Sequence, residues 1–154
     1  MAQLNLVIVS GLSGSGKSHA LKAFEDAGYF CIDNLPPALI PTFVELCNQQ
    51  GGEISNVALG VDVRERVFFS DLVGTLERVR SLGYAIRLLF LEARDEVLVR
   101  RFSESRRPHP LLPHLPVLEG VRFEKERVSE LRRHADRIID TSDLTVHELR
   151  DLLT

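Results

Sequence analysis

The chain is 154 residues long, with 44% hydrophobic and 27% charged residues and a formal net charge of −3. This balance is typical of one globular domain with a sizeable core, and its slight acidity argues against a nucleic-acid surface covering the whole domain. Neither a signal peptide nor an apolar run near the ~20 residues of a membrane span is recognised, so we expect a cytoplasmic protein without membrane contact.

Short apolar runs alternate with segments of helical periodicity along the whole chain. The expected strands are 4–9, 29–32, 54–61, 84–91 and 137–140. The expected helices are 17–27, 37–50, 67–82, 95–104, 118–134 and 145–153. Residues 106–118 contain four prolines and two histidines, and we expect an irregular loop there. The alternation predicts an α/β fold with a parallel sheet covered by helices on both faces.

The stretch GLSGSGKS at 11–18 follows the first expected strand and precedes the first expected helix. It matches the phosphate-loop pattern G-x-x-x-x-G-K-[ST], in which backbone N–H groups and a helix N-terminus surround an anion. We expect Lys17 to reach the β- and γ-phosphates and Ser18 to offer its hydroxyl to Mg²⁺. The motif therefore predicts a P-loop NTPase fold, and the alternative is a glycine-rich turn without a ligand.

Three acidic residues follow expected strands, at the edge of the sheet where ligands bind in α/β folds: Asp33, Asp62 and Glu92. Asp62 ends the run VALGV, which resembles a Walker B strand, so it is the first candidate for ordering Mg²⁺. Asp33 is the alternative, and either residue could instead cap a turn. All three carboxylates are candidates for a general base. Neither a catalytic nucleophile nor an acceptor pocket is recognised.

Four arginines precede or enter the proline-rich loop: Arg100, Arg101, Arg106 and Arg107. Arginine stabilises charge that develops during phosphoryl transfer, so we expect at least one of them to contact phosphate from a lid-like segment. The alternative is a solvated helix face paired with Glu96 or Glu104. His109 and His114 have no acidic or cysteine neighbour at metal-ligand spacing, so we expect no zinc site.

The two cysteines, Cys31 and Cys47, lie in apolar surroundings and do not form a disulfide framework. We expect them to be small buried residues with free thiols, in keeping with a reducing compartment.

The joined segments GLSGSGKS and ALKAFEDAGYFCIDNLP closely resemble the opening of the RapZ (YvcJ) family of RNase adapter proteins. The resemblance continues through VDVRE at 61–65, LLFLEA at 88–93, VRRFSESRRPHPL at 99–111 and ADRIIDTSDLTVHELRDLL at 135–153. It implies a nucleotide-binding domain related to nucleoside monophosphate kinases, which binds ATP and GTP and hydrolyses them weakly.

The family's nucleotide segments carry over by position. Its ATP loop falls on Gly11, Leu12, Ser13, Gly14, Ser15, Gly16, Lys17 and Ser18. Its second segment, assigned to GTP, falls on Asp62, Val63, Arg64 and Glu65, where the family often has Asn at the last position. Lys17 and Asp62 are then the catalytic candidates, and Ser18 is the candidate metal ligand.

The resemblance also implies partners. Family members are about twice this length, and their second half binds RNA, senses an amino-sugar phosphate and contacts the RNase system. Residues 1–154 would then form one P-loop nucleotide-binding domain, the N-terminal half of a longer protein. RNA and the RNase system would be partners only of that full-length protein, and we also allow for a homo-oligomer.

Three hypotheses follow for function. The leading one is a regulatory P-loop domain whose nucleotide state is signalled to an RNA-binding domain. The second is a small-molecule kinase that transfers the γ-phosphate of ATP to an acceptor. The third is a scaffold that keeps the fold without useful nucleotide binding.

Overall fold

The computed structural model describes residues 4–12, 14–49, 55–61, 66–105 and 116–153. The strands are β1 (Asn5–Gly11), β2 (Phe30–Ile32), β3 (Asn56–Gly60), β4 (Ala85–Glu92) and β5 (Arg137–Asp140). The helices are α1 (Lys17–Asp26), α2 (Ile40–Gln49), α3 (Arg66–Ser81), α4 (Asp95–Ser105), α5 (Val117–Arg127), α6 (Ser129–Arg133) and α7 (Val146–Leu153), with a 3₁₀ turn η1 (Pro37–Leu39) before α2.

The strands form one parallel sheet in the order β2-β3-β1-β4-β5. Residues 6–9 of β1 are apolar and buried, which suits the centre of a parallel sheet with both faces covered. β2 lies at an edge, and Phe30 on it is 46% exposed. From β1 the chain passes to the edge strand β2 and returns through β3, which pairs with β1. It then passes to the other side of β1, where β4 and β5 lie. Ligands bind beyond the carboxyl ends of the strands at such a reversal.

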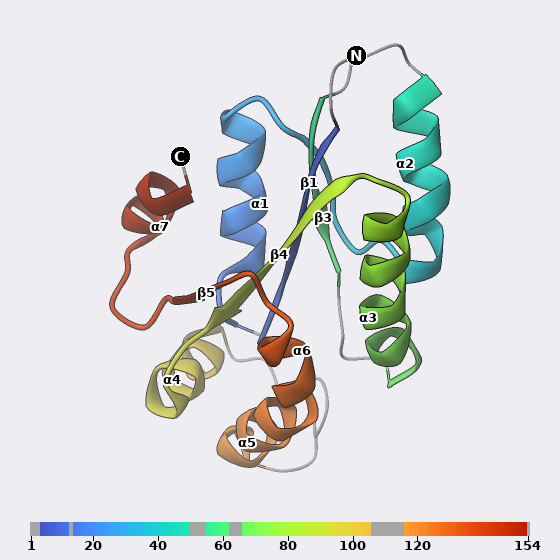
Figure 1. Ribbon diagram of the computed structural model, residues 1–154. Helices are drawn as coiled ribbons and strands as arrows, with labels where there is room; N and C mark the ends of the chain where they lie inside the picture. Colours follow the sequence, from blue (N-terminus) through green and yellow to red (C-terminus); the bar gives the residue numbers. More distant parts are fainter. Residues whose placement is uncertain (1–3, 13, 50–54, 62–65, 106–115, 154) are drawn as a thin grey trace.

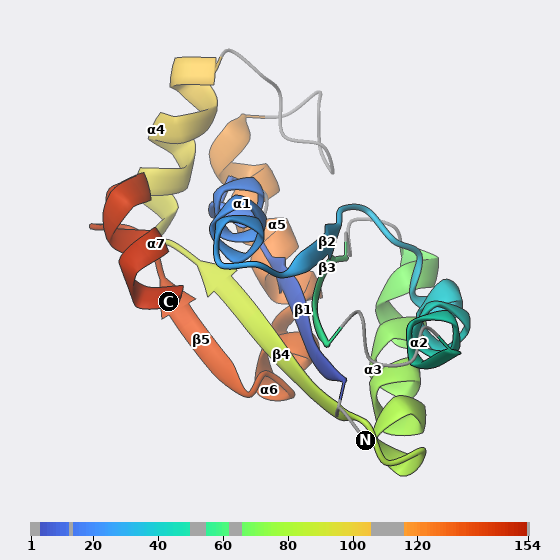
Figure 2. The ribbon, with the colours of Figure 1, turned by 90° about the horizontal axis from the view of Figure 1, so that it is seen from above.

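Helices cover both faces of the sheet (Figure 1). On one face, α1 and α7 lie together and contribute Phe24 and Leu149 to one buried cluster. On the other face, α2, α3 and α6 contribute Val44, Leu76 and Leu131 to a larger cluster. Figure 2 shows the same division from above, with α1 and α7 on the left and α2 and α3 on the right. The predicted parallel sheet with helices on both faces is therefore confirmed.

Most predicted elements begin and end within two residues of the observed ones, but the helix predicted over 118–134 is wrong. It is divided into α5 and α6 at Val128, whose backbone has φ −98° and ψ 8°. The Ser129 hydroxyl donates to the Glu126 carbonyl at 2.8 Å, a local bond that competes with regular helix geometry. The break leaves both Val128 and Leu131 buried in the core. Among the described residues, no helix is long and apolar enough to cross a membrane.

Both cysteines are free thiols, but they differ in burial. Cys47 on α2 is buried as expected, whereas Cys31 lies on the edge strand β2 and is only half-buried. The expectation for Cys31 is therefore only partly right, because an edge strand is covered less than a central one. Burial raises the pKa of both thiols, and nearby Glu25 adds to the rise at Cys31. Neither cysteine is thereby activated as a nucleophile.

Candidate functional site: a phosphate loop beside a charged pocket

The glycine-rich loop predicted from the sequence lies between the centre of the sheet and α1. Its glycines Gly11, Gly14 and Gly16 have φ values of 149°, 81° and 104°. At Gly11 a side chain is excluded by space as well, because a Cβ atom would collide with the Leu91 carbonyl of β4. The Leu12 amide then donates to that same carbonyl at 3.1 Å, which fixes the start of the loop to the sheet.

The loop closes on itself before α1 begins. The Ser15 amide donates to the Leu12 carbonyl at 3.0 Å, and the buried Ser15 hydroxyl donates to the same oxygen. Gly16 is the N-cap of α1, and no side chain of the described residues caps that helix end. The first amides of α1 therefore remain available to an anion, which the positive end of the helix would attract.

Lys17 and Ser18 begin α1, with Lys17 half-buried and Ser18 exposed. Within the described part of the chain, neither side chain has a hydrogen bond or ion pair. An unpaired ammonium and hydroxyl beside free helix amides are suited to triphosphate oxygens and to a hydrated Mg²⁺, which usually keeps water and phosphate ligands. Ser13 lies outside the described residues.

Arg101 of α4 and Thr141, which follows β5, form hydrogen bonds with backbone carbonyls of the loop. Arg101 Nη1 donates to the Gly14 carbonyl at 2.9 Å, and Arg101 Nη2 donates to the Thr141 carbonyl at 2.7 Å. The Thr141 hydroxyl donates to the Ser15 carbonyl at 2.7 Å and accepts from Arg101 Nη1 at 3.1 Å. Sequence reasoning expected a phosphate contact from at least one of four arginines, Arg101 among them, and did not identify Thr141 at all.

Asp33 lies exposed at the carboxyl end of β2, beside the end of β3. A Cβ atom on Gly60 would come within 2.6 Å of Asp33 Oδ1, so glycine is needed there for the carboxylate to lie across β3. Among the described residues, Asp33 has no hydrogen-bond or ion-pair partner. Residues 62–65, including Asp62, lie outside the described residues. The choice between Asp33 and Asp62 as the carboxylate near Mg²⁺ therefore stays a prediction.

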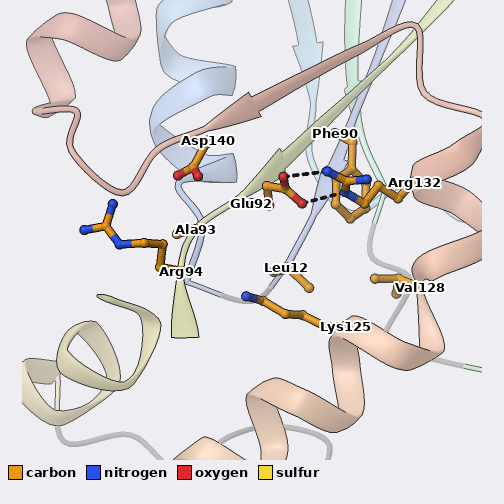
Figure 3. Close-up of a pocket in the computed structure, with 9 residues that line it drawn as sticks. All are labelled: Leu12, Phe90, Glu92, Ala93, Arg94, Lys125, Val128, Arg132 and Asp140. Atoms are coloured by element: carbon orange, nitrogen blue, oxygen red, sulfur yellow. Dashed lines mark hydrogen bonds and ion pairs between the residues drawn. The ribbon is translucent and has the colours of Figure 1, made fainter. Parts of the chain in front are cut away.

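A pocket of about 250 Å³ opens beside the loop, between the ends of β4 and β5 and the helices α5 and α6. Figure 3 shows its lining residues: Leu12, Phe90, Glu92, Ala93, Arg94, Lys125, Val128, Arg132 and Asp140. Arg132 donates to both oxygens of Glu92, at 2.7 and 2.9 Å. This pair raises the pKa of Arg132. Because both Glu92 oxygens accept from a cation, Glu92 is a weak candidate for the general base.

The other cations of the pocket also have acidic partners. Lys125 lies 2.5 Å from Asp95, and its hydrogen bond holds the pKa of that carboxyl below its ordinary value. Arg94 donates to Glu96 at 2.8 Å and to Asp143 at 3.0 Å, and these bonds raise the pKa of Arg94. The Asp140 carboxylate accepts from Ser142, which lowers the pKa of Asp140.

The predicted arginine lid is only partly described. Arg100 is exposed on α4, and Arg101 contacts the loop as described above. Glu96, one of the two partners expected for these arginines on a solvated helix face, is paired with Arg94, and the side chain of Glu104, the other, lies outside the described residues. Arg106, Arg107, His109 and His114 lie outside the described residues, so phosphate contact from a lid stays a prediction.

Solved structures with the same arrangement define the class of fold. Shikimate kinase from Bacteroides thetaiotaomicron has a TM-score of 0.65 at 18% identity, covering 97% of this chain and 94% of that one. A shikimate kinase from Acinetobacter baumannii in complex with shikimate also scores 0.65, at 16% identity and with 99% and 90% covered. A de novo designed P-loop NTPase fold scores 0.51 at 15% identity, with 98% and 90% covered. The P-loop NTPase fold, in the form found in small kinases, is confirmed.

The particular family follows from the sequence comparisons. The family model described as the RapZ-like N-terminal domain matches residues 4–154, and the chain belongs to this family. A nucleotide-binding protein of Clostridium botulinum is 49% identical over 150 residues, which is 97% of this chain and 51% of that protein. One of Clostridium kluyveri is 48% identical over 151 residues, with 98% and 52% covered. The chain spans about half the length of these curated relatives.

Proposed function

We propose that the domain binds ATP and GTP with Mg²⁺ at the loop 11–18 and hydrolyses them weakly. One observation carries the proposal: the uncapped N-terminus of α1 stands beside a half-buried Lys17 that has no acidic partner among the described residues. A half-buried ammonium without a counterion leaves its charge and hydrogen-bond donors available to an external anion. The curated relatives are named nucleotide-binding proteins, which supports the same ligand class.

The roles of the loop residues follow from their chemistry. The amides of the loop would bind phosphate oxygens, Lys17 would bind the β- and γ-phosphates, and Ser18 would hold Mg²⁺ together with water and Asp62. The metal would neutralise charge on the phosphates. Asp62, Val63, Arg64 and Glu65 are proposed as the second nucleotide segment, with Lys17 and Asp62 as the catalytic pair.

Weak hydrolysis is the expected activity because the described acidic groups are poorly suited to activate water. Both Glu92 oxygens are bound by Arg132, and the exposed Asp33 carboxylate has no partner among the described residues that would orient it toward a water molecule. The domain therefore suits sensing of a nucleotide better than rapid turnover.

The regulatory role belongs to a longer protein in this proposal. Residues 1–154 would be the N-terminal nucleotide-binding domain of a cytoplasmic RNase adapter, and the other half of the protein would bind RNA and the RNase system. The length of the relatives supports this division, since the chain matches about half of each. A homo-oligomer is part of the same proposal.

The test is a calorimetric titration of ATP and GTP, with and without Mg²⁺, on the wild-type protein and two lysine variants. Lys17→Ala should weaken binding by about tenfold or more, because it removes a charge-assisted contact to phosphate. Lys22→Ala is the matched control, since Lys22 is exposed on the same helix and should leave affinity unchanged. Equal affinities for wild type and Lys17→Ala would refute the assignment, and no binding by the wild type would favour the scaffold hypothesis.

A small-molecule kinase is the second candidate, and Asp33 is the observation that favours it. Asp33 is exposed at a strand end without a partner among the described residues, so its carboxylate is available to an acceptor hydroxyl. The experiment measures ADP formation from ATP with a panel of hydroxylated acceptors. A rise well above the rate without acceptor, lost in Asp33→Asn, would establish a kinase. An unchanged rate across the panel would leave weak hydrolysis as the activity.

A further inference from the structure

Two successive carbonyls of the phosphate loop, those of Gly14 and Ser15, accept hydrogen bonds from Arg101 and Thr141. Thr141 is 3% exposed, and its hydroxyl has the Ser15 carbonyl as acceptor at 2.7 Å and Arg101 Nη1 as donor at 3.1 Å. The Glu92 carbonyl lies 3.3 Å from the same hydroxyl, but a hydroxyl has only one proton, and the shorter contact assigns it to Ser15 while a lone pair accepts from Arg101. Arg101 in turn bridges the Gly14 carbonyl and the Thr141 carbonyl.

These contacts decide which way the loop amides point. In a trans peptide the C=O of one residue and the N–H of the next point in opposite directions. The Gly14 carbonyl faces Arg101, so the Ser15 amide points the other way and reaches the Leu12 carbonyl at 3.0 Å. The Ser15 carbonyl faces Thr141, so the Gly16 amide points away from Thr141. That is the direction an anion-binding loop requires.

Thr141 is itself held by the sheet, and the residues that follow it lead into α7. The Thr141 amide donates to the Glu92 carbonyl of β4 at 2.8 Å. Four residues further on, Thr145 and Glu148 cap α7 reciprocally, at 3.1 and 3.2 Å. Leu149 of α7 then packs at Gly16, where a Cβ atom would lie 3.5 Å from its Cδ2. Residues 141–149 therefore contact the phosphate loop at two successive residues.

We propose that Arg101 and Thr141 are positioning residues for the nucleotide site, and that they make its phosphate affinity depend on the segment 141–149. This inference rests on the proposed function, because it assumes that the loop binds phosphate. Any movement of the turn before α7 would rotate the Ser15–Gly16 peptide and weaken phosphate binding. By thermodynamic reciprocity, bound nucleotide would stabilise that turn and the position of α7. A partner domain attached beyond α7 would sense the nucleotide in this way.

The test compares three threonine variants. Thr141→Val keeps the shape and removes the hydroxyl, so affinity for ATP and for inorganic tripolyphosphate should fall about tenfold. Thr141→Ser restores the hydroxyl and should bind within about twofold of wild type. Thr42→Val is the matched control, because it removes a hydroxyl from an exposed position on α2, outside the segment 141–149. Arg101→Lys keeps the positive charge but loses the guanidinium group that binds two carbonyls at once, so it should bind ATP more weakly than wild type.

Hydrogen exchange in the nucleotide-free protein is the independent measurement. The amides of residues 14–18 should exchange faster in Thr141→Val than in wild type, and not in Thr42→Val. Unchanged exchange together with unchanged tripolyphosphate affinity in Thr141→Val would overturn the inference, as would a Thr141→Ser variant as defective as Thr141→Val. If wild type binds neither ATP nor tripolyphosphate, the proposed function fails, and the exchange of the loop amides alone decides whether Thr141 positions them.

Discussion

The phosphate loop and the neighbouring pocket are built on opposite electrostatic principles. In the loop, Lys17 has no acidic partner among the described residues, and the α1 amides beside it are uncapped. In the pocket, each cation has a carboxylate: Arg94 has Asp143, Lys125 has Asp95 and Arg132 has Glu92. The loop therefore leaves positive charge available to an external anion, whereas each cation of the pocket is paired with a carboxylate.

The two regions also differ in how their residues are distributed along the chain. The loop is one contiguous stretch of eight residues, and Arg101 and Thr141 bind its carbonyls. The pocket draws its lining from the ends of three strands and from α5 and α6 (Figure 3). The comparison teaches that unpaired charge, more than the presence of charge, distinguishes the candidate ligand site in this domain.

The largest expected effect concerns Gly11, where both the backbone conformation and the contact with β4 exclude a side chain. Gly11→Ala places a Cβ against the Leu91 carbonyl at a backbone conformation that L residues rarely adopt. The free energy of unfolding should fall by about 3 kcal/mol or more. Gly74→Ala is the control, because Gly74 is exposed on α3 with nothing within 4 Å, and its substitution should raise stability by about 0.5–1 kcal/mol. Urea unfolding measures both. A tolerated Gly11→Ala would show that the loop can move away from β4.

The loop was predictable from sequence because its function depends on local backbone geometry. Three glycines, a lysine and a serine at fixed spacing specify a conformation with little help from the rest of the chain. Even so, the sequence did not indicate Thr141, because its partner in the loop is 126 residues away. The α/β sheet was predictable for a related reason: continuous apolar runs such as residues 6–9 require burial on both sides.

The pocket was not predictable, because its identity depends on which strand ends and helix faces meet. Glu92 was recognised as a carboxylate at a strand end, but its pairing with Arg132 across 40 residues was not. The division of α5 from α6 at Val128 was missed as well, since the charged periodic pattern continues through it. That division lies in the wall of the pocket, where Val128 is a lining residue. Tertiary packing decided both features.

A smaller effect is expected from breaking the pocket's central ion pair. Arg132→Met removes the partner of Glu92, whose side chain is 20% exposed, and should lower stability by about 1 kcal/mol. Affinity for ATP should stay within about twofold of wild type, because the pocket's charges are neutralised internally. Glu92→Gln in the Arg132→Met background should recover part of the stability, since no unpaired carboxylate then remains. A large loss of ATP affinity in Arg132→Met would contradict the contrast between loop and pocket and show that the pocket is part of the nucleotide site.

The smallest expected effect concerns Asp95, which ties α4 to α5 beside the pocket. Its contacts with Lys125 at 2.5 Å and with Arg122 at 3.6 Å lower the pKa of Asp95, with the Lys125 hydrogen bond as the main cause. A carboxyl whose pKa is lower in the folded state than in the unfolded one stabilises the fold above the unfolded pKa, near 3.9. That contribution is lost as the pH falls through the lower, folded pKa.

Asp95→Asn should therefore lower stability at pH 7 by about 0.5 kcal/mol, since the groups are partly exposed and screened by solvent. The difference between wild type and variant should shrink below about pH 4 and vanish once Asp95 is protonated in the folded protein. Glu77→Gln is the control, because Glu77 is exposed on α3 and has no ion pair among the described residues. Urea unfolding at pH 7 and pH 3 measures the difference. If Asp95→Asn matches wild type at pH 7, the pairing of Lys125 adds nothing to stability, and its ammonium would be as available to an anion as that of Lys17.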